Sequence, residues 1–275
     1  MFRYIKDDLS KNMNIIRDKE FIQFQESWFD NKVKEINRET FIKIADDWFK
    51  SSKINDLQGW RHFDNIDITN GNTQYIESFF VRYGLSGFQI LENEYAYYTL
   101  MGKHGCKLDR LEPNLPLLLT IPHYNYGGNR PEYDQLLAIC ENRNIDIHID
   151  FAWIPLAKGI DIDLSHPNIK SFAMSISKFA MTWNKAGLRW SKQRTMDPIT
   201  IMNHYYRNIN SNQLTCGAHM MQRFDRDHIW NKYEMYYNEL CDSLDTKPTN
   251  IITVLKFEGD DSTYDAGKIL TSLGL

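Results

Sequence analysis

The stretch IDIHIDFAWIPLAKGIDIDLSHPNIKSFAMSISK, residues 145–178, contains two apolar runs that each lead to a chemically reactive side chain. The first run is followed by Asp150 and the second by Lys178. Short runs rich in Ile, Phe and Met that are bounded by polar residues predict buried strands. An acid at the end of a buried strand needs a partner, because burial of an unpaired charge is costly.

Strand-like and helix-like segments alternate before this stretch. Residues 64–84 predict a short strand, a Gly-containing turn and a helix, and residues 88–105 predict a strand, a loop and a helix. Residues 115–121 predict a buried strand, and residues 130–144 an amphipathic helix. This alternation predicts an α/β fold with a mostly parallel sheet and helices on both faces.

The ends of the chain have a more helical character. Apolar residues recur at helical spacing between residues 19 and 49, a long helix is predicted over residues 227–244, and a closing helix over residues 262–275. We therefore expect three units along the chain: an N-terminal helical segment over residues 1–60, a large α/β domain over residues 61–196, and a C-terminal helical and reduced small domain over residues 197–275.

The overall composition excludes several classes of protein. The 275 residues are 42% hydrophobic and 25% charged, and the formal net charge is −4, so no basic excess predicts nucleic-acid binding. No apolar run reaches 18 residues, and the N-terminus lacks the apolar core of a signal peptide, so we expect no membrane association. The four cysteines show no CxxC pairing, which predicts free thiols and a cytoplasmic location. The scattered histidines predict no metal site.

Polar side chains follow each of the five predicted strands. Ligands of open parallel sheets bind beyond the carboxyl ends of the strands, so we expect these side chains to meet at one edge. They are residues 70–73, residues 93–95, residues 123–125, Asp150 and residues 175–178.

These residue types suit a phosphorylated pyridine aldehyde. The helix that begins after Gly71 would bind the phosphate at its N-terminus, with Asn72 and Thr73 as additional donors. Lys178 would form a Schiff base with the aldehyde. Asp150 would hold a proton on the pyridine nitrogen.

Two further side chains would contact the ring itself. Asn125 could donate a hydrogen bond to the phenolic oxygen of the ligand. Tyr95 could stack on the ring face, with Tyr97 and Tyr98 as competing candidates for the same position.

Five short motifs together resemble the large domain of fold-type I pyridoxal-phosphate (PLP) enzymes, the aspartate aminotransferase superfamily. The resemblance covers residues 64–192. The motifs are TNGNTQ (69–74), PHYNYGG (122–128), DFAW (150–153), SISK (175–178) and AGLRW (186–190). They correspond in order to the family's phosphate turn, its N-P-T-G segment, D-x-A-Y, S-x-S-K and G-x-R.

The resemblance implies roles for particular residues. Asn125 takes the place of the family's ring-binding Asn, and Asp150 that of the partner of the pyridine nitrogen. Lys178 takes the place of the Schiff-base lysine, while Ser175 and Arg189 take the places of phosphate ligands.

The chain also departs from the family pattern. N-P-T-G is N-Y-G-G here, and Trp153 replaces a tyrosine, so that an indole N–H stands in for a hydroxyl group. Arg189 lies 11 residues after Lys178, about three more than is common, so Lys185 and Lys192 are alternatives for its role.

The resemblance implies a PLP-dependent aminotransferase that acts on a small amino acid or amine and a keto acceptor, as a homodimer. Two other readings are a PLP-dependent lyase or decarboxylase and a catalytically inactive PLP-fold binding protein. The family's arginine for the substrate carboxylate has no matching motif. The available arginines are Arg207, Arg223 and Arg226.

Overall fold

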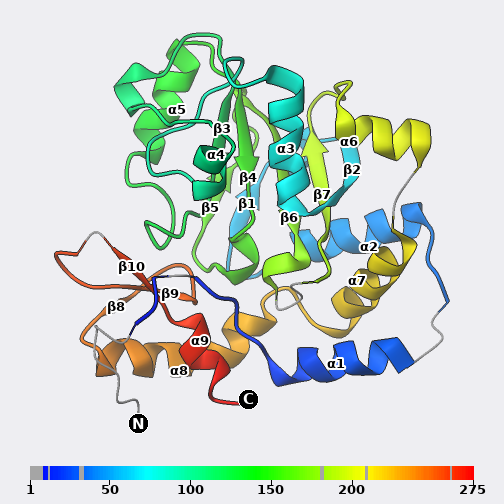
Figure 1. Cartoon of the computed structure of the whole chain (residues 1–275), viewed down its shortest axis with the longest axis vertical. Coiled ribbons are helices and arrows are strands. Elements are labelled where there is room, and N and C mark those ends of the chain that lie inside the picture. Colours follow the sequence, from blue (N-terminus) through cyan, green and yellow to red (C-terminus); the bar gives the residue numbers. More distant parts are fainter. Residues whose placement is uncertain (1–8, 12, 31–33, 180–182, 208–209, 261) are drawn as a thin grey trace.

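A five-stranded sheet lies at the centre of the computed structural model of the chain (Figure 1). The structure describes residues 9–11, 13–30, 34–179, 183–207, 210–260 and 262–275. In spatial order the strands are β2 (Asn65–Asn70), β7 (Ala186–Ser191), β6 (Ile169–Ser175), β4 (Ile147–Asp150) and β3 (Leu117–Thr120).

The sheet is mostly parallel, as the sequence predicts. Strands β3, β4 and β6 are parallel neighbours, and β7 runs antiparallel to both β6 and β2. Strand β2 therefore has the same direction as β3, β4 and β6, and their carboxyl ends lie on one edge.

Helices cover both faces of the sheet, which confirms the predicted α/β architecture. Side chains alternate across a strand, so Leu118 packs on one face while Leu117 and Leu119 pack on the other. The Leu118 face carries α3 (Gly71–Tyr83), α4 (Ala96–Leu100) and α6 (Pro198–Thr200). The opposite face carries α2 (Arg38–Lys50), α5 (Tyr133–Asn142) and α7 (Ser211–Arg223). Helix α3 crosses in front of the sheet in Figure 1.

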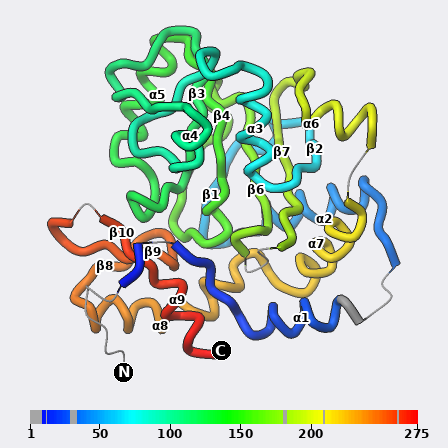
Figure 2. Tube along the Cα trace, in the orientation of Figure 1, coloured from blue at the N-terminus to red at the C-terminus, as the bar shows by residue number. Residues whose placement is uncertain are grey.

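The two ends of the chain lie together, with the blue N-terminal segment beside the orange and red C-terminal elements (Figure 2). The Lys19 N–H donates to the Leu275 carbonyl at 3.1 Å, and the Asn14 side-chain amide donates to Asp265 at 2.7 Å. One apolar cluster extends from Ile16 to Leu270 and includes the sheet. The division of the chain at residues 60 and 196 remains a prediction.

The remaining elements are short or peripheral. The helices are α1 (Lys19–Asp30), α8 (His228–Ser243), α9 (Gly267–Thr271), the 3₁₀ turns η2 (Trp60–His62), η3 (Leu108–Arg110), η4 (Ile154–Leu156) and η5 (Ile176–Lys178), and the π-helix η6 (Ile201–Tyr206). The strands are β1 (Asp56–Gln58), paired with β5 (Asp161–Asp163), and the antiparallel set β8 (Lys247–Pro248), β9 (Val254–Lys256) and β10 (Thr263–Asp265).

Two local predictions were wrong. Residues 262–275 contain β10 before α9, because Thr263–Asp265 pairs with β9, whereas the sequence predicts only a helix. The strand predicted near residue 88 is reduced to isolated bridges at Gln89 and Leu91. None of the helices in the described ranges is long and apolar enough to cross a membrane.

Asp18 anchors the N-terminal segment to the C-terminal helix α8. Its fully buried carboxylate caps α1, since Oδ1 accepts hydrogen bonds from the Glu20 and Phe21 N–H groups at 2.9 and 3.2 Å. Oδ2 accepts from the Tyr233 hydroxyl at 3.0 Å and pairs with Lys232 at 2.8 Å. One carboxylate thus joins two segments that are distant in sequence.

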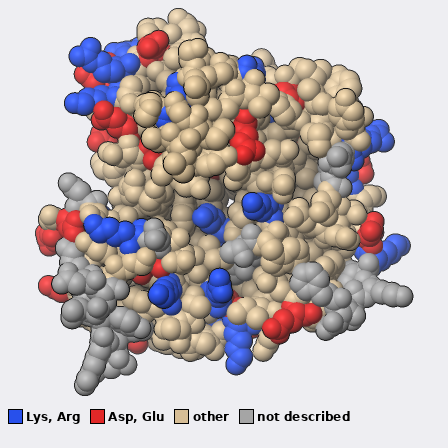
Figure 3. All heavy atoms as spheres, viewed as in Figure 1, with Lys and Arg blue, Asp and Glu red and all other residues tan. Residues whose placement is uncertain are grey.

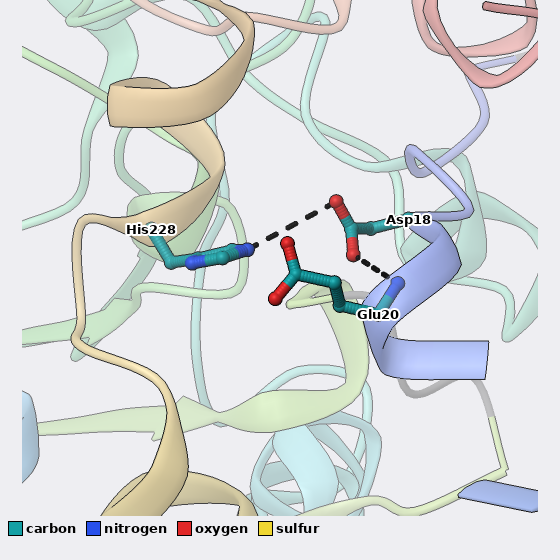
Figure 4. Close-up of side chains that lie close together, drawn as sticks. All are labelled: Asp18, Glu20 and His228. Carbon is teal, nitrogen blue, oxygen red and sulfur yellow. Dashed lines mark hydrogen bonds and ion pairs between the residues drawn. The ribbon is translucent and has the colours of Figure 1, made fainter. Parts of the chain in front are cut away.

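Asp18, Glu20 and His228 point toward one another (Figure 4) and have the spacing of metal ligands. The Lys232 ammonium group lies 2.8 Å from both Asp18 and Glu20. The Lys232 ammonium group thus already supplies a positive charge to Asp18 and Glu20. The closeness of these acids therefore has a structural explanation that needs no metal ion.

Asp18→Ala is expected to lower the free energy of unfolding by about 2–3 kcal/mol, because it removes a helix cap and leaves the Tyr233 hydroxyl without its partner. Urea unfolding would measure the change. Asp47→Ala is the control, because Asp47 belongs to an exposed ion pair with Lys43 and should change stability by less than about 1 kcal/mol. Equal losses in the two variants would contradict the assigned role of Asp18.

Candidate active site

The carboxyl edge of the sheet borders a cavity of about 230 Å³. Seven of the ten predicted cofactor-binding residues line it: Gly71, Asn72, Thr73, Tyr95, Asp150, Trp153 and Lys178. The other lining residues are Ile15, Ile76, Thr120, Ala152, Ser177 and Lys185. On the face shown in Figure 3, a hollow crosses the middle of the molecule, and Lys and Arg side chains (blue) lie along it.

Asp150, the last residue of β4, has one oxygen held by the protein and one left for a ligand. Oδ1 accepts hydrogen bonds from the Ala152 N–H at 2.9 Å and from the Asn72 side-chain amide. Among the described residues, no hydrogen bond reaches Oδ2. Burial raises the pKa of Asp150 to about 6, although the Asn72 and Ala152 hydrogen bonds and the charge of Lys178 oppose the shift.

Asn72 joins helix α3 to two strands of the sheet. Its side-chain amide donates both to Asp150 and to the Ala173 carbonyl at 2.8 Å. These two bonds use both amide hydrogens, so Asn72 is not a phosphate donor in this arrangement. The prediction that it helps to bind a phosphate is replaced by a role in orienting Asp150.

Lys178 reaches the cavity from η5, directly after strand β6. It is half-buried, and its Nζ lies 4.3 Å from the centre of the Trp153 ring. Burial lowers the pKa of Lys178, while the Asp150 carboxylate opposes this shift. A lysine with a lowered pKa releases its proton more readily, and its neutral amine can act as a nucleophile.

The first turn of α3 provides a place for an anion. Gly71 has a φ of 79°, and a Cβ built at this position would lie 3.2 Å from the Cβ of Lys185, so glycine permits the close approach of helix and strand. The side chain of Asn70, the residue before this 13-residue helix, makes no capping hydrogen bond to the described chain. Its N-terminus, with Thr73, Ser177 and Lys185 around it, combines helix-dipole and side-chain groups that favour a phosphate.

Two aromatic side chains line the cavity. Trp153 is 6% exposed and Tyr95 is 39% exposed. The competing tyrosines are used elsewhere, because Tyr97 donates to Glu77 at 2.7 Å and Tyr98 is fully buried against Thr120. Tyr95 is therefore the tyrosine of this segment that a ring-shaped ligand would contact.

Asn125 and Ser175 do not line the cavity. The side-chain amide of Asn125 donates to the Asn93 carbonyl at 3.1 Å, and its N–H donates to His123 at 3.1 Å. Ser175 is buried, with its hydroxyl 3.0 Å from that of Ser177. Ser177, to which the family motifs give no role, is the serine of this pair that lines the cavity.

Arg189 also lies away from the cavity, so its predicted role as a phosphate ligand does not fit the structure. Its buried guanidinium group pairs with Asp67 at 2.6 Å and with Asp197. The reason is strand direction: β7 is antiparallel to β6, so β7 begins at the edge where β6 ends. Lys185 directly precedes β7 and reaches the cavity, whereas Arg189 pairs in register with Ala173 further along the sheet.

None of the three arginines considered for a substrate carboxylate lines the described cavity. The buried Arg226 guanidinium donates to the Ile154 and Pro155 carbonyls at 2.6 and 3.2 Å. Arg223 lies over the rings of Phe24 and Phe224. Arg207 borders a different cavity.

The buried Glu94–Arg130 pair contacts a residue in the wall of the cavity. Glu94 is paired with Arg130 at 3.2 Å and accepts a hydrogen bond from the Thr120 N–H at 3.3 Å. Burial raises the pKa of Glu94 to about 7, and Arg130 opposes the shift. Thr120 faces the cavity, so this pair helps to position one of its walls.

Arg189→Leu is expected to lower the free energy of unfolding by about 3–5 kcal/mol, because it leaves two buried carboxylates without their cation. Arg110→Leu, at an exposed position, is the control for urea unfolding. A stable Arg189→Leu protein that binds PLP weakly would instead support the role of a phosphate ligand.

Asp150 should make stability fall as the pH rises from 3.8 to about 6 in the ligand-free protein. The folded-state pKa lies above the unfolded value, so the folded chain binds more protons in this window and loses that advantage as Asp150 ionises. Unfolding free energies measured across this range should decline more steeply for the wild type than for Asp150→Asn. Parallel curves would contradict the raised pKa.

No family model and no curated protein matches the sequence. Solved structures do match the fold. A PLP-bound C-S lyase from Staphylococcus hominis has a TM-score of 0.65 at 10% identity, over 90% of this chain and 74% of that chain. An aromatic aminotransferase from Pyrococcus horikoshii OT3 has a TM-score of 0.61 at 10% identity, over 91% and 80%.

An aromatic amino acid aminotransferase from Burkholderia cenocepacia J2315 has a TM-score of 0.57 at 13% identity, over 90% of this chain and 80% of that chain. At such identities the similarity is one of fold. The chain therefore has the aspartate aminotransferase-like fold of fold-type I PLP-dependent enzymes.

Proposed function

We propose that this chain binds PLP covalently through Lys178 and acts as an aminotransferase on a small amino acid or amine. The observation that carries the proposal is that the Lys178 amine and the Asp150 carboxylate line one cavity from adjacent strands. A nucleophilic amine and a carboxylate in one partly buried site are what a pyridine aldehyde requires of a protein.

The first turn of α3 would bind the phosphate, together with Thr73, Ser177 and Lys185. Three observations support this assignment. The Asn70 side chain does not cap the helix, Gly71 allows the helix to lie close to Lys185, and Lys185 carries an exposed positive charge. The choice of Lys185 in place of Arg189 is supported by the lining of the cavity, which includes Lys185 and not Arg189.

Asp150 Oδ2, which accepts no hydrogen bond from the described protein, would accept one from the protonated ring nitrogen. Asn72 would hold Oδ1 and so orient the carboxylate. Tyr95 and Trp153 would flank the ring. When bound, PLP would supply an electron sink for bonds to the α-carbon of the substrate.

Lys178 would have a second role once the substrate amine takes its place. Its amine, with its pKa lowered by burial, can remove the proton from the α-carbon of the substrate and return it to another atom. The charge of the Asp150 carboxylate opposes this lowering of the Lys178 pKa.

A PLP-dependent lyase or decarboxylase is the second candidate. It is favoured by the absence of an arginine from the described lining of the cavity and by the structural similarity to a C-S lyase. The two reactions differ in stoichiometry, because an aminotransferase consumes a keto acceptor and a lyase does not. The third candidate, an inactive binding protein, gains no support from a cavity that retains both Lys178 and Asp150.

We also propose a homodimer, by analogy with the family that the motifs resemble, and a cytoplasmic location. The latter rests on the four cysteines, which are free thiols and of which three are buried. Light scattering of the purified protein tests the dimer.

The cofactor assignment is tested by the absorbance spectrum of the protein purified with PLP, before and after borohydride. The wild type should show a band of lysine-bound PLP that borohydride fixes to the chain, and Lys178→Ala should lack it. Lys185→Ala is the matched control: it should keep the covalent band but bind PLP about tenfold more weakly, because one charge-assisted contact is lost. A colourless wild type would overturn the proposal.

A further inference from the structure

A second cavity, of about 280 Å³, lies on the same face of the sheet as the candidate active site. It lies below the second half of α3 and shares no lining residue with the first cavity. Its floor comes from strands β4, β6 and β7, and its roof from Tyr75, Phe79, Arg82 and Tyr83 of α3. Nothing in the proposed reaction uses it.

The floor carries a row of polar side chains. His148, Ser171 and Ser191 are register partners across three neighbouring strands, so their side chains share one face. His148 Nδ1 lies 2.7 Å from the Ser171 hydroxyl, which in turn lies 2.7 Å from the Tyr75 hydroxyl. Ser171 is thus occupied by protein partners, and the imidazole is held in place.

Two buried donors on this floor have no hydrogen-bond partner in the described protein. They are the Ser191 hydroxyl and the Nε–H of Arg189, in residues that are 5% and 3% exposed. A buried donor without a partner destabilises the folded protein, so such groups normally bind something else. Both residues line the cavity, so a ligand bound there would lie next to them.

The charges around the cavity favour an anion. Its two acids are already paired, Asp146 with Lys170 at 3.4 Å and Asp197 with Arg189, which also pairs with Asp67. Arg82, at an exposed position, forms no ion pair within the described chain and lies over the ring of Tyr83 at 4.6 Å. Arg82 is therefore available to an incoming negative charge.

The remaining walls are aromatic. Phe79 packs edge-on against the His148 ring at 4.8 Å and lies 5.4 Å from the Tyr83 ring. Burial lowers the pKa of His148 to about 3, so this ring is neutral and does not add a charge. Polar donors at the floor and flat apolar walls together select for a planar molecule with one acidic group.

We propose that this cavity binds a small planar carboxylate, with its carboxylate accepting hydrogen bonds from Ser191 and Arg189 and its flat body against the Phe79 and Tyr83 side chains that line the cavity. The site lies close to the candidate active site, because His148 is two residues before Asp150 on β4 and Ser171 is two residues before Ala173 on β6. Binding at this site does not depend on the proposed cofactor.

Isothermal titration of the full chain with benzoate, at constant ionic strength set by chloride, tests the proposal. We expect saturable binding with one site per chain. Ser191→Ala and Arg82→Gln should each weaken it by about tenfold, the usual effect of losing one hydrogen bond to a charged group.

Lys185→Ala, in the first cavity, is the matched control and should leave benzoate affinity unchanged. If Lys185→Ala abolishes binding while the Ser191 and Arg82 variants retain it, benzoate occupies the first cavity and the proposal is wrong. Failure of benzoate to bind the wild type, with heats equal to those of chloride alone, would also overturn it. Neither result would bear on PLP binding, which has its own spectroscopic test.

Discussion

The contact between Asn72 and Asp150 is the interaction on which the site depends. It joins the first turn of α3 to the end of β4, and the same amide also reaches the Ala173 carbonyl on β6. A carboxylate at a buried strand end is tolerated only when hydrogen bonds compensate for its lost hydration. Here both bonds fall on one oxygen, and this leaves the other with unsatisfied accepting capacity at the cavity wall.

Strand direction determines which cations reach the site. Strands β3, β4 and β6 end at the cavity edge and bring Thr120, Asp150 and Lys178 there. Strand β7 runs in the opposite direction, so its start supplies Lys185 and its middle carries Arg189 into a buried pair of acids. Because β7 is reversed, Lys185 lies at the cavity, where it can bind an anion, and Arg189 lies among buried acids, where its role is structural.

Helix α3 organises both cavities on its face of the sheet. Its first turn borders the candidate active site, and its second half covers the row of His148, Ser171 and Ser191. The apolar residues of this face form a smaller cluster than those of the opposite face. Side chains that alternate along β4 put His148 and Asp150 on this same polar face, and this explains why two polar cavities lie in series beneath one helix.

The sequence by itself determined the α/β architecture, the shared edge of the strand ends and seven residues of the cavity, because hydrophobic periodicity and strand-end chemistry are local properties. Only the tertiary structure decided that Asn72 pairs with Asp150. It also decided that Asn125 and Ser175 do not line the cavity, and that Lys185 lines it in place of Arg189. These features depend on which strands are neighbours and in which direction they run. Such non-local relations leave no periodic signal in the chain, since they arise from packing between residues that are 32 to 122 positions apart.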